Sequence, residues 1–182
     1  MSRWMIASDL HGDATAVEAL LHAYRKSGAE RLILLGDLLY HGPRNDLPAG
    51  YDPKRVISLL NEARDSLLCV RGNCDTEVDQ MVLSFPILAD YALLSVDGLT
   101  IFVTHGHRFS KESLPPMTRG DILLHGHTHV PVAERFGEDH WVLNPGSVSI
   151  PKEQSAKSYL LYENRQFTFY TLDGAPYRSV TV

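Results

Sequence analysis

The chain has 182 residues, of which 44% are hydrophobic and 21% are charged, with a formal net charge of −5. This length and composition indicate one ordinary globular domain and exclude a disordered or collagen-like chain. The negative charge, the lack of a basic cluster and the lack of an apolar run of about 18–20 residues predict no stable nucleic-acid partner and no membrane partner. Two cysteines and an N-terminus that turns polar too early for a secretory signal predict a cytoplasmic protein with reduced thiols.

The N-terminal half predicts alternating strands and helices. The expected strands are Trp4–Ser8, Arg31–Leu35 and Leu67–Val70. Asp13 and Gly28 predict the start and end of a first helix, because Asp caps helix N-termini and Gly adopts the left-handed backbone that follows many helices. Asp52-Pro53 predicts the start of a second helix, after a loop over Gly36–Gly50. This order predicts three parallel strands.

The C-terminal half is rich in short strands. Asp97-Gly98 predicts a tight turn in a hairpin of Ala92–Val96 and Leu99–Thr104. Further strands are expected at Asp121–Leu124, His140–Leu143, Ser158–Tyr162 and Gln166–Leu172. These strands predict a second, largely antiparallel sheet that packs face to face on the first, with helices outside.

Five of the predicted strands end in polar residues, usually beside a glycine. The segments are Asp9–Gly12, Gly36-Asp37, Arg71–Asp75, Thr104–His107 and His125–His129. One such ending is usually a turn or an exposed loop. Because ligand sites on α/β sheets collect at the carboxyl ends of the strands, five endings in chain order predict a binding site at one edge.

These strand ends supply seven potential metal ligands, namely Asp9, His11, Asp37, Asn73, His105, His127 and His129. Seven ligands exceed the needs of one tetrahedral zinc ion but suit two metal ions that share a bridging carboxylate. Mixed imidazole and carboxylate ligands favour Mn, Fe, Zn or Co over Ca or Mg. Two divalent cations with two aspartates leave a positive site that suits an anionic substrate. Such a metal pair can activate a hydroxide and stabilise an in-line phosphoryl displacement.

The motifs Asp-x-His, Gly-Asp, Gly-Asn-x-Asp, His-Gly-His and Gly-His-x-His, in this order, resemble those of the calcineurin-like metallophosphoesterases. The segments His41–Asn45, Gly72–Asp75 and Asn144–Ser147 are similar to the YfcE-type bacterial phosphodiesterase branch of that family. The resemblance extends from Met5 to about Lys152. It implies an α/β fold with one domain over residues 1–182, a four-layer α-β-β-α sandwich in which two mixed β-sheets pack face to face and are flanked by helices.

The resemblance also implies a metal-dependent phosphodiesterase, in which a hydroxide bridging two divalent metal ions attacks a small phosphodiester. The implied ligands are Asp9, His11 and His129 for the first ion, Asn73, His105 and His127 for the second, and Asp37 as the bridge. We expect two divalent ions per chain, Mn first, with Zn, Fe, Co or Ni as alternatives.

Cys74 departs from the family pattern, because many members have a histidine there that is thought to protonate the leaving oxygen. A thiol with an ordinary pKa near 8.5 is a poorer acid, so Cys74 is either catalytic or a small packing residue. Asp75 is expected to orient Cys74 or Asn73 as part of the catalytic set. Cys69, inside the third strand, is expected to be a packing residue.

Three further residues near the predicted ligands are candidates for contact with substrate. His107, a catalytic candidate, and His41, a substrate-binding candidate, either contact phosphate, orient a ligand or are structural. Arg44 is expected to pair with the substrate phosphate, the alternative being a solvated loop residue.

Two other functions are open to the same fold. A binding scaffold resembling the eukaryotic retromer subunit would have an incomplete site, whereas the ligand set here is complete. Cyclic-nucleotide phosphodiesterases and protein phosphatases of the family usually have the histidine that Cys74 replaces. The apolar segment Met81–Leu88 fits either a homo-oligomer contact or a core loop.

Overall fold

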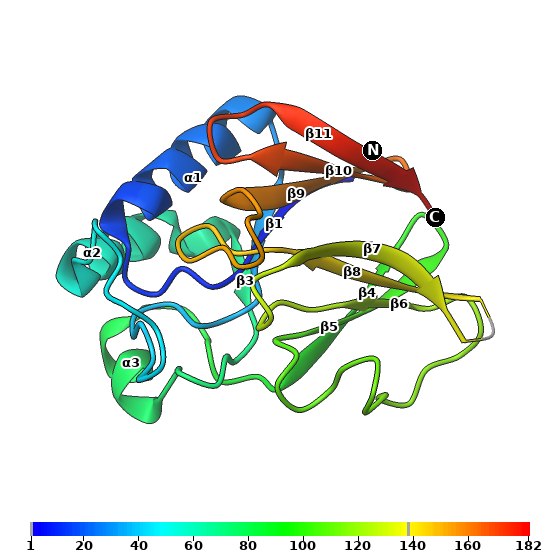
Figure 1. Ribbon diagram of the computed structural model, residues 1–182, viewed down its shortest axis with the longest axis horizontal. Helices are drawn as coiled ribbons and strands as arrows, with labels where there is room; N and C mark the ends of the chain where they lie inside the picture. The colour runs from blue at the N-terminus through cyan, green and yellow to red at the C-terminus, as the bar shows by residue number, and fades with distance from the viewer. Residues whose placement is uncertain (1, 138) are drawn as a thin grey trace.

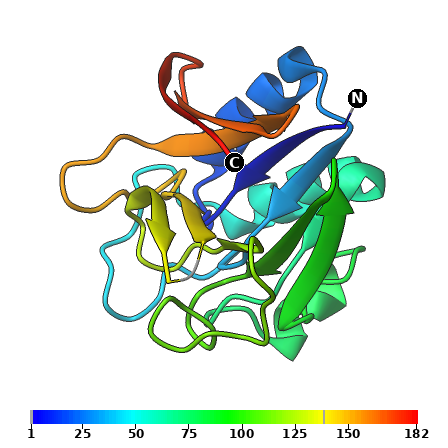
Figure 2. The ribbon, with the colours of Figure 1, turned by 90° about the vertical axis from the view of Figure 1, so that its right-hand side faces the viewer.

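The computed structural model describes residues 2–137 and 139–182, and over these residues the strands form two mixed sheets packed face to face (Figure 1 and Figure 2). The first sheet has the order β11-β10-β9-β1-β2-β3, and the second has the order β4-β5-β6-β8-β7. The strands of the first sheet are β1 (Arg3–Ala7), β2 (Arg31–Leu34), β3 (Leu67–Cys69), β9 (Ser158–Glu163), β10 (Gln166–Thr171) and β11 (Pro176–Thr181). Those of the second are β4 (Tyr91–Val96), β5 (Leu99–Thr104), β6 (Ile122–Leu124), β7 (Pro131–Phe136) and β8 (His140–Pro145). The expected pair of mixed sheets is confirmed.

The first sheet joins the two ends of the chain. As predicted, β1, β2 and β3 are parallel. On its other side β1 pairs antiparallel with β9, with Trp4 opposite Tyr162, and β10 and β11 follow. The expectation that the last strands belong to the second sheet is therefore wrong, because β9 instead hydrogen-bonds to the free side of β1.

The second sheet is mixed rather than largely antiparallel. Its central strands β5, β6 and β8 are parallel, and β4 and β7 pair antiparallel at its two edges. The predicted hairpin turn is confirmed, since Asp97 and Gly98 both have positive φ, at 49° and 75°.

The helices begin and end largely where the sequence predicts. The first, α1 (Ala14–Ser27), begins after Asp13, whose carboxylate accepts from the Ala16 amide, and ends at Gly28 with φ 69°. Asp52 caps α2 (Pro53–Ala63), which a short 3-10 turn at Arg64–Ser66 follows. The six-residue α3 (Glu77–Val82) was not expected from the sequence.

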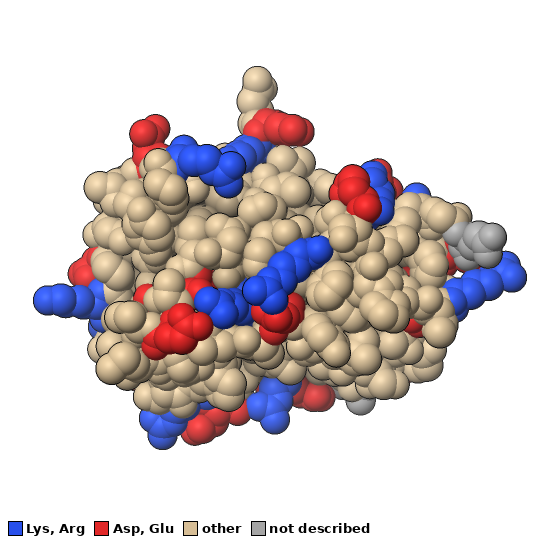
Figure 3. All heavy atoms as spheres, turned by 90° about the horizontal axis from the view of Figure 1, so that it is seen from below, with Lys and Arg blue, Asp and Glu red and all other residues tan. Residues whose placement is uncertain are grey.

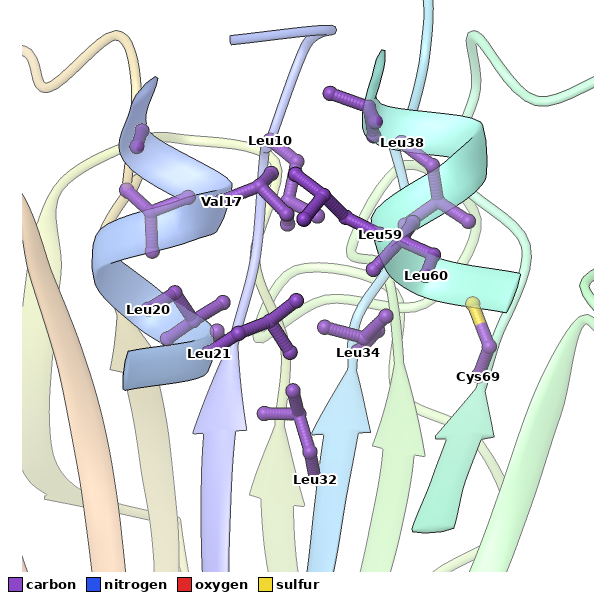
Figure 4. Close-up of a cluster of buried hydrophobic side chains, with 14 of the residues drawn as sticks. Leu10, Val17, Leu20, Leu21, Leu32, Leu34, Leu38, Leu59, Leu60 and Cys69 are labelled. Atoms are coloured by element: carbon purple, nitrogen blue, oxygen red, sulfur yellow. The ribbon is translucent and has the colours of Figure 1, made fainter. Parts of the chain in front are cut away.

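One hydrophobic core lies between α1, α2 and the outer face of the first sheet, where Val17 and Leu20 face Leu34 and Leu60 (Figure 4). Cys69 is buried in this core, as predicted. A second core fills the space between the two sheets.

The outer face of the second sheet lacks the expected helix layer within the described residues. Phe109 and Met117, from the loop between β5 and β6, pack against Phe102 there instead. Loop residues thus take the place of the fourth layer. Within the same residues, no helix has the length and apolar character needed to cross a bilayer.

Candidate metal centre

A first cluster of predicted ligands forms where β1 and β6 end. His11 Nε2 lies 3.2 Å from His129 Nε2. Asp9 Oδ1 lies 3.2 Å from His129 Nε2 and 3.7 Å from His11 Nε2. All three residues are buried, and Asp9 Oδ1 has no hydrogen-bond partner among the described residues. One ligand atom from each residue lies within 4.8 Å of the other two, which is close enough to hold one metal ion.

The hydrogen bonds of the Nδ1 atoms determine the tautomers of His11 and His129. His11 Nδ1 donates to the Tyr40 carbonyl at 2.7 Å, and His129 Nδ1 donates to the Ile150 carbonyl at 2.6 Å. A carbonyl only accepts, so each Nδ1 is protonated and each neutral ring presents an Nε2 lone pair to the cluster. Two lone pairs at 3.2 Å repel each other unless a proton or a cation lies between them. The cluster therefore fits a metal ion, and the carbonyls provide the orienting contacts that metal-binding histidines need.

A second cluster lies at the ends of β3, β5 and β6. His105 Nε2 is 3.0 Å from Asn73 Oδ1 and 3.2 Å from His127 Nδ1. The other His105 nitrogen donates to the Leu35 carbonyl at 2.7 Å, so His105 also presents its Nε2 lone pair when neutral. The two imidazole nitrogens of this cluster thus have the same 3.2 Å spacing as those of the first cluster.

Asp37 lies between the two clusters. Its Oδ2 is 3.7 Å from His11 Nε2 and 3.5 Å from His105 Nε2, while its Oδ1 accepts from the Cys74 amide at 2.8 Å. One carboxylate thus faces a histidine of each cluster. This placement suits a ligand shared by two ions.

Most of the predicted ligands have strained backbone. Positive φ values occur at Asp9 (56°), His11 (46°), Asp37 (56°), His127 (67°) and His129 (61°). For residues other than glycine this conformation costs of order 1–2 kcal/mol each, and such strain concentrates at functional sites.

The buried charges are coupled. Burial alone would raise the pKa of Asp9, yet the neighbouring imidazoles of His11 and His129 hold it well below its ordinary value. Burial likewise opposes charge on His105, but Asp37 and Asp9 raise its pKa to about 9. Burial and the His105 charge lower the pKa of His127 to about 4. The carboxylates therefore make the centre attractive to cations.

Cys74 lies at the margin of the first cluster. Burial and the nearby Asp37 carboxylate raise the pKa of its thiol to about 12. Its Sγ accepts from Asn73 Nδ2 at 3.2 Å and belongs to a group of donor atoms with His11 and Asp37. The thiol thus faces the site rather than the apolar core.

Asp75 has different partners from those expected. Its carboxylate accepts from the backbone amides of Asp37, Leu38 and Gly72 at 2.7–2.9 Å. The expectation that it orients the Cys74 or Asn73 side chain is therefore wrong, because these three amides point at it. Asp75 instead joins the β2 and β3 ends and positions Asp37.

Gly72 allows these two loops to meet. A Cβ built on it would overlap the Asp37 amide nitrogen and Oδ1 and lie 2.9 Å from Asp37 Cγ. Only glycine fits between β3 and the Asp37 side chain.

The remaining predicted residues are spread around the centre. The His107 ring lies 5.4 Å from the His105 ring, and its buried Nδ1 has no partner among the described residues. His41 packs edge-on against Tyr40 and Tyr51, with centroids at 4.8 and 5.4 Å, and does not line the cleft over the centre. Arg44 lines that cleft.

Three functional candidates were missed from the sequence. Ser147 and Ser149 both donate hydroxyl hydrogen bonds to the Asp9 carbonyl, at 2.8 and 2.7 Å, and so hold the strained ligand in place. Lys152 lines the same cleft as Arg44. The Asn144–Ser147 motif was a signal for Ser147, whereas no local pattern singles out Ser149 or Lys152. A larger cavity of about 520 Å³ lies between α1 and the β9–β10 pair and contains none of the predicted site residues.

The chain matches known proteins over most of its length. Residues 3–166 match the model of the calcineurin-like phosphoesterase superfamily domain. The chain is 49% identical to "Phosphodiesterase YfcE" of Escherichia coli K12 over 164 residues, which are 90% of this chain and 89% of that protein. It is 25% identical to "Phosphodiesterase MJ0936" of Methanocaldococcus jannaschii, over 78% of this chain and 81% of that protein.

Solved structures show the same fold. The structure of E. coli Yfce, described as a phosphoesterase, superimposes with a TM-score of 0.95 at 46% identity and covers 98% of both chains. A Vps29 structure from Entamoeba histolytica has a TM-score of 0.64 at 19% identity, with 98% of both chains covered, and shows the fold alone.

Proposed function

Because the chain belongs to the calcineurin-like phosphoesterase superfamily and is a hydrolase of that class, we propose that it hydrolyses small phosphodiesters with two divalent metal ions. The observation that carries the proposal is the pair of opposed imidazole nitrogens in each cluster, 3.2 Å apart, with Asp37 between the clusters. The 49% identity to a protein named as a phosphodiesterase supports the choice of diesters.

The proposed ligands are those implied by the sequence. The first ion would be held by Asp9, His11 and His129, the second by Asn73, His105 and His127, and Asp37 would be shared between them. When bound, two divalent ions lower the pKa of a water nucleophile and stabilise the charge that develops on the phosphoryl oxygens. Manganese as the metal, a cytoplasmic location and a single domain over residues 1–182 stay predictions.

The protein's own groups hold this arrangement. The carbonyls of Tyr40, Ile150 and Leu35 fix the ligand histidines with their Nε2 atoms toward the centre. Asp75 holds the Asp37 backbone through charge-assisted hydrogen bonds, which are stronger than neutral ones. Ligands fixed in this way need little rearrangement when the ions and the substrate bind.

Leaving-group protonation is the weak step. The Cys74 thiol, with a pKa raised to about 12, holds its proton too tightly to be an effective acid at neutral pH. We therefore expect diesters with good leaving groups to be the better substrates. His107 lies beside His105 and His127 and is, with Arg44, a candidate for contact with the phosphate or the leaving group.

The test uses purified protein treated with EDTA and then loaded with Mn²⁺. We expect hydrolysis of bis-p-nitrophenyl phosphate to require the metal and to exceed hydrolysis of the monoester p-nitrophenyl phosphate. Zn²⁺, Co²⁺ and Ni²⁺ are compared in parallel. Faster turnover of the monoester, or full diester turnover in EDTA, would contradict the proposal.

Two observations bear on the alternative functions. The scaffold alternative is disfavoured because all seven expected donors converge on two clusters. On the face in Figure 3, basic and acidic side chains alternate without a broad patch of one sign, which supports small substrates over nucleic acid for that face.

A further inference from the structure

Most basic side chains of this protein are paired. Of the 17 lysine and arginine residues, five have no side-chain hydrogen bond or ion pair within residues 2–137 and 139–182. They are Arg25, Lys26, Arg44, Lys54 and Lys152. Two of the five, Arg44 and Lys152, line the cleft over the metal centre, together with His11, His129 and Asp37.

Lys152 is carried by a turn that is fixed to the first cluster. The Lys152 amide donates to the His129 carbonyl at 3.2 Å, and the His129 ring in turn donates to the Ile150 carbonyl. The turn is closed by Ser155, whose hydroxyl and amide donate to the Lys152 carbonyl at 2.6 and 3.0 Å. These hydrogen bonds connect the Lys152 backbone directly to the ligand histidine.

Arg44 is carried by a loop that is bonded to the other histidine of the same cluster. The His11 ring donates to the Tyr40 carbonyl, and the Asn45 side chain donates to the His41 carbonyl at 2.8 Å. Each histidine of the first cluster is thus oriented by a loop that presents an unpaired cation two to four residues further on.

The charges around the cleft exceed what a simple diester can neutralise. Two divalent ions with Asp9, Asp37 and a hydroxide nucleophile would leave a net charge of about +1, and Arg44 and Lys152 add two more positive charges. A phosphodiester group carries a single negative charge. We propose that Arg44 and Lys152 form a subsite for a second anionic group of the substrate, beside the first cluster, so that the preferred substrates are phosphodiesters that also carry a carboxylate or a further phosphate. This inference rests on the proposed function.

The test compares two diesters of matched shape, p-nitrophenyl 2-carboxyethyl phosphate and p-nitrophenyl propyl phosphate, which differ by a carboxylate in place of a methyl group. We expect kcat/KM to favour the carboxyethyl diester by about tenfold in low salt, mainly through KM, because an exposed ion pair contributes about threefold to fivefold per cation. The preference should shrink as salt is raised, since exposed charges are screened.

Three variants locate the effect. Lys152→Met and Arg44→Met should each lower kcat/KM for the carboxyethyl diester more than for the propyl diester, and the double variant should remove the preference. Lys54→Met, which removes an unpaired cation on α2 outside the cleft, should leave the preference intact.

A binding measurement keeps this inference separate from the hydrolytic activity. In calorimetry with Mn²⁺-loaded protein, 3-phosphonopropionate should bind about tenfold more tightly than propylphosphonate, and the double variant should bind both alike. Equal binding of the two phosphonates, or a preference that survives in the double variant, would overturn the subsite. Failure to hydrolyse either diester, with the binding preference intact, would overturn the proposed function instead.

Discussion

Replacement of Gly72 by alanine should disable the centre without removing any of its ligands. The new methyl group would overlap the Asp37 amide and Oδ1 and lie 2.9 Å from Asp37 Cγ. Since ordinary contacts between heavy atoms are about 3.5–4 Å, Asp37 must move by roughly 1 Å. A displacement of that size near reacting groups costs on the order of 10²-fold in rate. We expect kcat for bis-p-nitrophenyl phosphate to fall about 100-fold.

The assay measures turnover and bound Mn²⁺ in the same sample, normalised to the folded fraction from near-UV circular dichroism. Gly120→Ala is the matched control. Its added Cβ would meet no atom within 4 Å, but its φ of 88° is unfavourable for alanine, so it should lose stability and keep activity. Gly72 lacks the positive φ, so its effect isolates the clash with Asp37.

If Gly72→Ala kept turnover within threefold of the wild type with normal Mn²⁺ content, Asp37 would not need its observed position. A stability loss equal to that of Gly120→Ala with unchanged activity would lead to the same conclusion.

The other predictions concern the ions, the thiol and one buried phenol. Elemental analysis of metal-saturated protein should give two Mn²⁺ per chain, and Asp37→Asn should reduce this number and abolish most activity; one ion per chain in the wild type would contradict the assignment. A plot of log rate against leaving-group pKa should have a steep slope for the wild type and a shallower one for Cys74→His. Cys74→Ala should hydrolyse aryl esters at nearly the wild-type rate; a hundredfold lower rate in this variant would show that the thiol acts as the general acid. Burial and the hydrogen bond to Asp97 raise the pKa of Tyr162 to about 12 from an ordinary 10.0. As the pH rises, this phenol therefore ionises first in the unfolded chain. The free energy of unfolding should fall by roughly 1 kcal/mol between pH 9 and pH 11. Urea titrations over this pH range should show a fall that is smaller in Tyr162→Phe than in the wild type by about this amount.

The elements that could be predicted are those whose signals are local. Asp13 and Gly28 mark the ends of α1, and Asp97-Gly98 marks the hairpin, because each acts through backbone groups within a few residues. The polar strand ends were informative because parallel strands bring their carboxyl ends to one edge.

The structure contains strands and one helix that the sequence analysis did not predict. The edge strands β7 and β11 begin at Pro131 and Pro176, where the missing amide hydrogen is tolerated only at an edge or a strand start. The capping box at Thr76 and Asp79 was a readable signal for α3. The pairing of β9 with β1 leaves no local trace.

The roles of Asp75 and Lys152 also could be found only from the three-dimensional structure. The carboxylate of Asp75 binds amides that belong to another strand end, 37 and 38 residues earlier in the chain. Lys152 reaches the centre because its turn is bonded to His129. Neither contact follows from the spacing of residues along the chain.

The pairing of β1 with β9 has a consequence for biosynthesis. Strand β1, which ends two residues before Asp9, lies between β2 and β9 in the finished sheet, and Met5 is opposite Leu161. The chain between β1 and β9 must form a long closed loop, which is entropically unfavourable, and contacts between residues so far apart in sequence form late and slowly. The ribosome makes the chain at about 5–20 residues per second. Until β9 emerges, β1 lacks one of its two neighbouring strands, and the sheet that positions Asp9 and His11 is incomplete. The polypeptide should therefore become able to bind metal only near the end of translation, when β9 has been made, and not when its last ligand, His129, has been made.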